Sequence, residues 1–134
     1  MNEVNKKEFN HLKIHTQYSI CEGALRTADL AKYCKINQIK AVGLCDTNNL
    51  CGALEFSETI AKSKTQPIIG TQIQVNYKGN SGKIPIFAKD LEGYKNLIKL
   101  SSKSFLEIKV DETPHVKIED IEKNNAGLFT WFAD

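Results

Sequence analysis

The chain has 134 residues, of which 41% are hydrophobic and 25% are charged, which is ordinary for a globular protein of about one domain. The net charge of +2, with no Lys/Arg run longer than Lys6-Lys7, gives no sign of a nucleic-acid-binding face. The sequence contains neither a signal peptide nor an apolar run near the ~20 residues that a membrane span needs. We therefore expect a cytoplasmic protein with no membrane partner.

Residues 9–15 alternate between polar and apolar side chains and predict a first strand. On such a strand His11, Lys13 and His15 project to one face, and the residues between them project toward a core. Two or three imidazoles at this spacing can bind a divalent metal for hydrolysis. Lys13, however, places a fixed cation in the middle of that row, where a metal would have to bind.

Two helices flank a short buried strand in the next part of the chain. The first helix is expected over 28–38, with Thr27 as its N-cap. The strand, 41–45, is a continuous apolar run typical of a strand buried on both faces, and a polar loop over 46–49 follows it. The second helix is expected over 51–63. The inward side chains of the two helices are expected to be Leu30, Ala31, Cys34, Leu54, Ile60 and Ala61.

The rest of the chain continues the alternation of strands and helices. Strands are expected over 68–75 and 84–88, and Asp90 is the expected N-cap of a third helix. A short helix over 118–124 and a last strand over 128–132 complete the chain. Strands alternating with helices indicate parallel βαβ units, so the expected fold class is α/β.

Functional groups of such folds collect at the carboxyl ends of the strands. The sequence places His15 and Asp46 at these ends. The chain also stops directly after an apolar strand, which would leave the edge of a sheet unpaired. We therefore expect residues 1–134 to be the front portion of a longer protein.

The four cysteines, Cys21, Cys34, Cys45 and Cys51, form no C-x-x-C pair. Neither a zinc ribbon nor a redox motif is therefore supported. No histidine lies close enough in sequence to Cys45 or Cys51 to activate a nucleophilic thiol. We expect buried, reduced thiols.

Several segments of the chain together resemble a PHP domain: residues 11–19, 22–24, 46–56 and 67–70. Residues 49–56 and 93–100 resemble, more narrowly, the PHP domain that opens the α subunits of bacterial DNA polymerase III. The resemblance extends from about Phe9 to Phe132. It implies the N-terminal part of a distorted (β/α) barrel of PHP type, present here as one incomplete domain.

The resemblance also implies where the metal ligands of the family would lie, and three of those positions have changed. Lys13 and Thr47 stand where metal-binding members have histidines, and Gln72 stands where they have a glutamate. Lys13 is normally protonated, Thr47 is at best a weak ligand and Gln72 carries no charge. The segment is therefore expected to bind no metal or other cofactor.

Three residual candidates for metal ligands remain: His15, Glu22 and Asp46. For Glu22 and Asp46 we favour a structural role over ligation, such as capping a loop or pairing with Lys13. In that hypothesis the lysine is an internal counter-ion in the place of the metal.

The resemblance implies that the parent protein is a DNA-directed DNA polymerase, a nucleotidyltransferase that copies a template in DNA replication with Mg²⁺. The polymerase carboxylates of the family lie far downstream, so this segment has no expected catalytic residue and is expected to be inactive alone. Its implied role is a structural scaffold and subunit contact. The implied partners are the rest of the α subunit, the proofreading exonuclease subunit, and DNA through the parent protein.

Two alternatives stay open from the sequence. The first is an active metal-dependent phosphoesterase or 3′–5′ exonuclease with a remodelled site, in which His15, Glu22 and Asp46 bind Zn²⁺ or Mn²⁺. The second is a free-standing fragment that only binds a partner.

Overall fold

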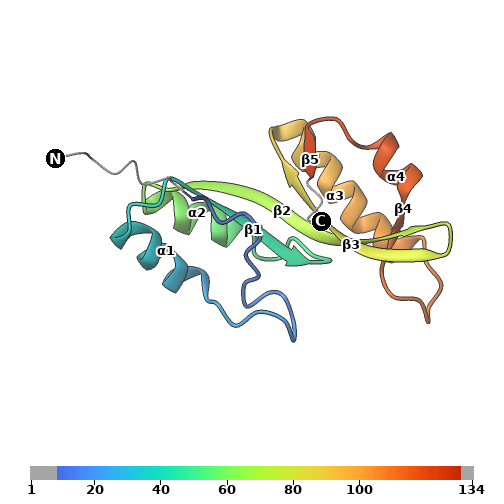
Figure 1. The fold of residues 1–134 in the computed structure, drawn as a ribbon, viewed down its shortest axis with the longest axis horizontal. Coiled ribbons are helices and arrows are strands. Elements are labelled where there is room, and N and C mark those ends of the chain that lie inside the picture. The colour runs from blue at the N-terminus through green and yellow to red at the C-terminus, as the bar shows by residue number, and fades with distance from the viewer. Residues whose placement is uncertain (1–8, 131–134) are drawn as a thin grey trace.

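The fold is a mixed sheet with helices packed against it, seen in a computed structural model that describes residues 9–130. Figure 1 shows the elements in chain order. The helices are α1 (Thr27–Ile36), α2 (Ala53–Lys62), α3 (Leu91–Leu106) and α4 (Ile118–Lys123). The strands are β1 (Ala41–Thr47), β2 (Gln66–Tyr77), β3 (Asn80–Ala88), β4 (Val116–Lys117) and β5 (Leu128–Thr130). Residues 131–132 of the predicted last strand lie outside the described range.

The sheet has the strand order β1-β2-β3-β5, and β4 pairs with the far end of β2. Strands β1 and β2 are parallel and are joined through α2, which confirms the predicted βαβ unit. Strands β2 and β3 form a long antiparallel hairpin that runs the length of the molecule (Figure 1). Its turn is Lys78-Gly79, with φ of 48° and 79° at the two residues, the geometry of a tight two-residue hairpin loop.

The predicted first strand over 9–15 is not a regular strand, although this segment does lie along β1. Gly43 donates its N–H to the carbonyl of His11 (2.8 Å) and accepts from the N–H of Ile14 (3.3 Å). A regular parallel ladder would bond Gly43 to residues two apart, whereas these are three apart, so the segment bulges by one residue. The alternation that would put His11, Lys13 and His15 on one face is therefore interrupted.

Two apolar clusters form the core, one at each end of β2. The first lies between α1, α2 and β1 and contains Leu30, Cys34, Val42, Leu44, Phe56 and Ile60. The second lies between α3 and the hairpin and contains Ile73, Val75, Ile86, Leu97, Leu100 and Val116. No helix of the described part of the chain is long and apolar enough to cross a membrane.

Three details of the helices test the predicted patterns. Asp90 caps α3 as expected, because its carboxylate accepts from the N–H of Gly93 (2.8 Å). Thr27 is not an N-cap: it is the buried first residue of α1, and Arg26 holds the cap position. Leu54 and Ala61 are exposed rather than inward, because α2 turns the stripe of Ala53, Phe56 and Ile60 toward the core.

Candidate functional site

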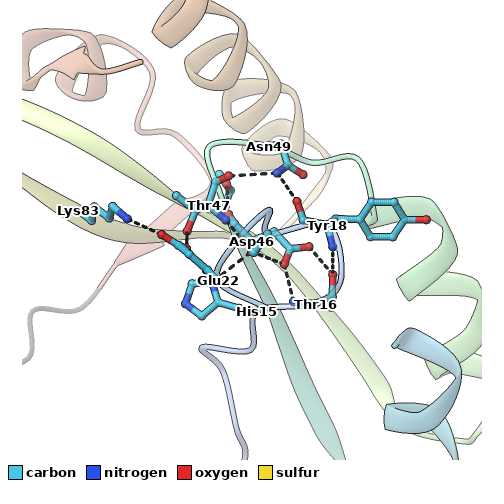
Figure 2. Close-up of polar contacts among 10 residues, drawn as sticks. His15, Thr16, Tyr18, Glu22, Asp46, Thr47, Asn49 and Lys83 are labelled. Atoms are coloured by element: carbon cyan, nitrogen blue, oxygen red, sulfur yellow. Dashed lines mark hydrogen bonds and ion pairs between the residues drawn. The ribbon is translucent and has the colours of Figure 1, made fainter. Parts of the chain in front are cut away.

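Asp46 lies at the carboxyl end of β1 and is the centre of a buried hydrogen-bond network (Figure 2). Its carboxylate is fully buried. Oδ1 accepts from the backbone N–H of Thr16 (2.6 Å) and from the hydroxyl of Ser19 (2.7 Å), and Oδ2 accepts from the hydroxyl of Thr16 (2.7 Å). Both carboxylate oxygens of Asp46 thus face the loop that contains Thr16 and Ser19. Asp46 fastens that loop to the sheet.

Glu22 lies on the outer side of the same loop and binds a lysine from a different part of the fold. Its Oε1 is 2.7 Å from Nζ of Lys83, which lies on β3. Its Oε2 accepts a short hydrogen bond from the hydroxyl of Thr47 at the end of β1. The ammonium of Lys83, then the Thr47 hydroxyl, and more weakly the nearby His15, hold the pKa of Glu22 below its ordinary value of 4.5.

His15 is joined to both acidic residues through its Nδ1 atom. This nitrogen is 3.3 Å from Oγ of Ser19 and 3.9 Å from Oε2 of Glu22. The Ser19 hydroxyl already donates its proton to Asp46, and its oxygen accepts from the N–H of Thr47 (3.1 Å). A proton on Nδ1 of His15 fits this arrangement, because that N–H would donate to the Ser19 oxygen.

The three changed ligand positions make no common site. Among residues 9–130, no ion pair joins Lys13 to Glu22 or Asp46, so the expected counter-ion pair is not formed. Its place is taken by Lys83, which reaches Glu22 from the neighbouring strand. Gln72 is paired in register with Thr47 and is 5% exposed, and its side-chain oxygen accepts no hydrogen bond from the described residues.

A hollow of about 480 Å³ opens beside this network. Its lining includes Glu22 and Thr47 of the network, the larger side chains of Tyr18, Ile20 and Phe105, and neighbouring loop residues. Ile20 is 84% exposed and Phe105 is 51% exposed, so exposed apolar side chains line the same hollow as Glu22.

The cysteines divide into two kinds. Cys34 and Cys45 are buried, as expected, and burial raises the pKa of the Cys45 thiol to about 12. Cys21 and Cys51 are exposed, so the expectation of buried thiols is wrong for these two. A thiol with so high a pKa as that of Cys45 is a poor nucleophile, which agrees with a structural role.

The fold brings together the three residual ligand candidates, yet it does not aim them at a common point. Within the described residues no group of three His, Cys, Asp or Glu side chains could hold a metal ion. The carboxylate of Asp46 faces the Thr16–Ser19 side, whereas Glu22 and His15 face each other. Thr16 and Lys83 belong to the network but were not predicted from the sequence. The polar run after residue 15 is the local signal for Thr16, and no local signal points to Lys83.

The lowered pKa of Glu22 predicts a pH-dependent contribution to stability. A carboxylate whose pKa is depressed by folding stabilises the folded state above its unfolded pKa, and this contribution disappears as pH falls through the folded value. We expect Glu22→Gln to be less stable than the unsubstituted chain at pH 7 and equal to it once the pH is well below 4.5. Urea unfolding of both proteins across this range measures the difference. A gap that persists unchanged in acid would contradict the assignment.

Comparison with known proteins identifies the family. The model of the PHP domain matches residues 11–134. The DNA polymerase III subunit alpha of Rickettsia prowazekii is 38% identical over 122 residues, which are 90% of this chain and 10% of that protein. The corresponding subunit of Helicobacter pylori (strain ATCC 700392 / 26695) is 38% identical, and the match covers 75% of this chain and 9% of that protein. The subunit of Thermus aquaticus is 33% identical, and the match covers 92% of this chain and 11% of that protein. The chain thus spans about a tenth of the length of these relatives and matches their N-terminal regions.

A solved structure shows the same fold. This structure is of a Bifidobacterium adolescentis protein that is named as a metal-dependent phosphoesterase. Its TM-score to this chain is 0.54, and the two sequences are 17% identical. The match covers 71% of this chain and 32% of that one. At this identity the likeness concerns the fold, which agrees with the predicted PHP-type α/β architecture. The chain belongs to the PHP domain family.

Proposed function

We propose that this chain is the PHP segment of a bacterial replicative DNA polymerase α subunit, and that it acts there as a scaffold and subunit contact rather than as a phosphoesterase. The parent protein would carry out template-directed DNA synthesis with Mg²⁺ bound by residues outside this segment. The identity of 38% to a polymerase α subunit over nine-tenths of the chain supports the parent assignment.

The scaffold proposal rests on Asp46 and Glu22, because the oxygens of both carboxylates are bound by other groups of this chain. Asp46 directs both carboxylate oxygens to Thr16 and Ser19, and Glu22 binds Lys83 and Thr47. A divalent metal needs several such donors converging on one point. The donor set around β1 does not fit a resident metal, since no three His, Cys, Asp or Glu side chains among the described residues converge on one point.

The hollow beside the network supports a contact role. The side chains of Ile20 and Phe105 expose apolar surface at its rim, next to the charged residues Glu22 and Lys83. Exposed apolar groups rimmed by polar ones are typical of surfaces that contact another protein or domain. The rest of the α subunit and the proofreading exonuclease subunit are the proposed partners.

The proposal predicts that the purified chain carries no stoichiometric Zn²⁺ or Mn²⁺ and does not hydrolyse the 3′ end of single-stranded DNA. Metal content by elemental analysis and hydrolysis with added Mn²⁺ test it together. His15→Ala is the matched variant, because it removes the one imidazole of the cluster. Stoichiometric metal in the unsubstituted chain, with cleavage that His15→Ala abolishes, would establish the phosphoesterase or exonuclease alternative instead.

A further inference from the structure

Helix α3 carries large apolar side chains on two opposite sides, one buried and one exposed. Its buried side, which contains Leu97 and Leu100, packs on the hairpin of β2 and β3 (Figure 1). Leu91, Ile98 and Phe105 lie on the outward side and are 68%, 42% and 51% exposed. Each is seven positions after the one before, so the three follow one another along a single line of the helix surface. We call these three residues the α3 stripe.

The spacing of the α3 stripe indicates that its partner is another helix. A surface helix normally turns polar side chains to the solvent, so three aligned apolar ones on the outward side are unusual. Apolar residues that recur every seven positions form the seam along which two α-helices pack side by side. Phe105 also lines the hollow that Ile20 lines, so the stripe continues into the contact surface proposed above.

Two lysines beside the stripe indicate the charge of the partner. Lys95 and Lys99 are exposed and lie four positions apart along one edge of the stripe. Within residues 9–130 neither forms an ion pair, and Nζ of Lys99 is 3.5 Å from the side-chain oxygen of Asn96. An antiparallel pair of α3 helices centred on Ile98 would place these lysines beside those of the second copy. Aspartate or glutamate on a different helix would pair with them instead.

We infer that the α3 stripe binds an amphipathic helix of a separate partner protein, and that this helix carries acidic side chains beside its own apolar seam. The inference deepens the contact role proposed above and rests on it. Lysines at the rim attract an acidic partner from solution and orient it, which is what charges contribute between separate molecules. The three apolar side chains of the stripe then lose their contact with water, which stabilises the complex.

A synthetic peptide helix of about three heptads, with leucine at the seam positions and glutamate beside them, is the probe. We expect this acidic peptide to bind the purified chain and Ile98→Ser to weaken the binding by about tenfold or more. Fluorescence anisotropy of the labelled peptide measures both. Ile36→Ser is the matched control, because it removes an isoleucine that is 79% exposed on α1, and it should leave binding unchanged. Phe105→Ser is the second stripe variant if Ile98→Ser does not fold.

A charge reversal tests the acidic character of the partner. The double variant Lys95→Glu, Lys99→Glu should lose the acidic peptide and bind a version that has lysine in place of glutamate. Lys35→Glu reverses an exposed lysine on α1 and should bind the acidic peptide as the unsubstituted chain does. Equal binding of the two peptides by the unsubstituted chain would overturn the inference. Self-association of the chain that Ile98→Ser abolishes would also overturn it, because the stripe would then bind a second copy.

This inference and the scaffold proposal fail in different measurements. A chain without metal or hydrolysis that does not bind the acidic peptide would overturn the role of the α3 stripe and leave the scaffold proposal standing. Stoichiometric metal with cleavage would overturn the scaffold proposal, whereas peptide binding that Ile98→Ser weakens would still support the role of the stripe.

Discussion

Replacing Asp46 by alanine is expected to lower the free energy of unfolding by about 3–5 kcal/mol, because several buried hydrogen-bond donors lose their acceptor and each costs about 1–3 kcal/mol. The substitution would leave three donors without an acceptor: the N–H and hydroxyl of Thr16 and the hydroxyl of Ser19. All three groups belong to side chains or backbone that are essentially inaccessible to water. Urea unfolding of the purified chain, followed by circular dichroism, measures the loss.

Two further variants separate the network from the loss of an acid in general. Asp111→Ala removes an exposed loop carboxylate and is expected to change stability by no more than about 0.5 kcal/mol. Asp46→Asn should lie between the two, because its amide oxygen still accepts from the loop while its NH₂ group faces donors. A loss in Asp46→Ala no larger than that in Asp111→Ala would show that the network contributes little to stability.

Local patterns were sufficient to predict the parts of the fold that depend on neighbours in sequence. The apolar run beginning at Ala41 became a buried parallel strand, and Asp90 became the N-cap of α3, because both depend on a few adjacent residues. In α2 the prediction was right for Ile60 but wrong for Leu54, which is exposed while Phe56 is buried in the core. Burial depends on which side the sheet lies, and a single helix does not carry that information.

The site was predictable only where the residues lie at strand ends. His15 and Asp46 were placed there by the order of elements, and they do lie in one network. Lys83 was not predictable in the same way, because it reaches Glu22 across a hairpin and 61 residues of chain. The bulge between His11 and Ile14 was hidden as well, since polar–apolar alternation is the same for a regular strand and for one with an extra residue.

The bulged segment packs closely against Gly43, so adding a side chain at Gly43 is expected to destabilise the fold. A Cβ atom at Gly43 would lie 2.4 Å from the carbonyl oxygen of Leu12 and 2.7 Å from its Cα, both of them backbone atoms that cannot move without shifting the whole segment. Gly43→Ala is therefore expected to push residues 11–14 away from β1. We expect a loss of about 2–3 kcal/mol in the free energy of unfolding, as for an overpacked core.

The same shift is expected to weaken the hydrogen bonds between Thr16 and Asp46, because the displaced segment leads directly into Thr16. Hydrogen exchange of the Thr16 amide, whose N–H is bound to Asp46, is expected to accelerate in Gly43→Ala along with the fall in stability. Gly82→Ala is the matched control, because a Cβ at Gly82 on β3 would meet no atom within 4 Å. Equal stability and equal Thr16 exchange in the two variants would mean that the first segment is not held in place by its close approach to Gly43. Faster exchange at Thr16 in Gly43→Ala alone would show that this approach, made possible by the missing side chain, holds the loop over Asp46.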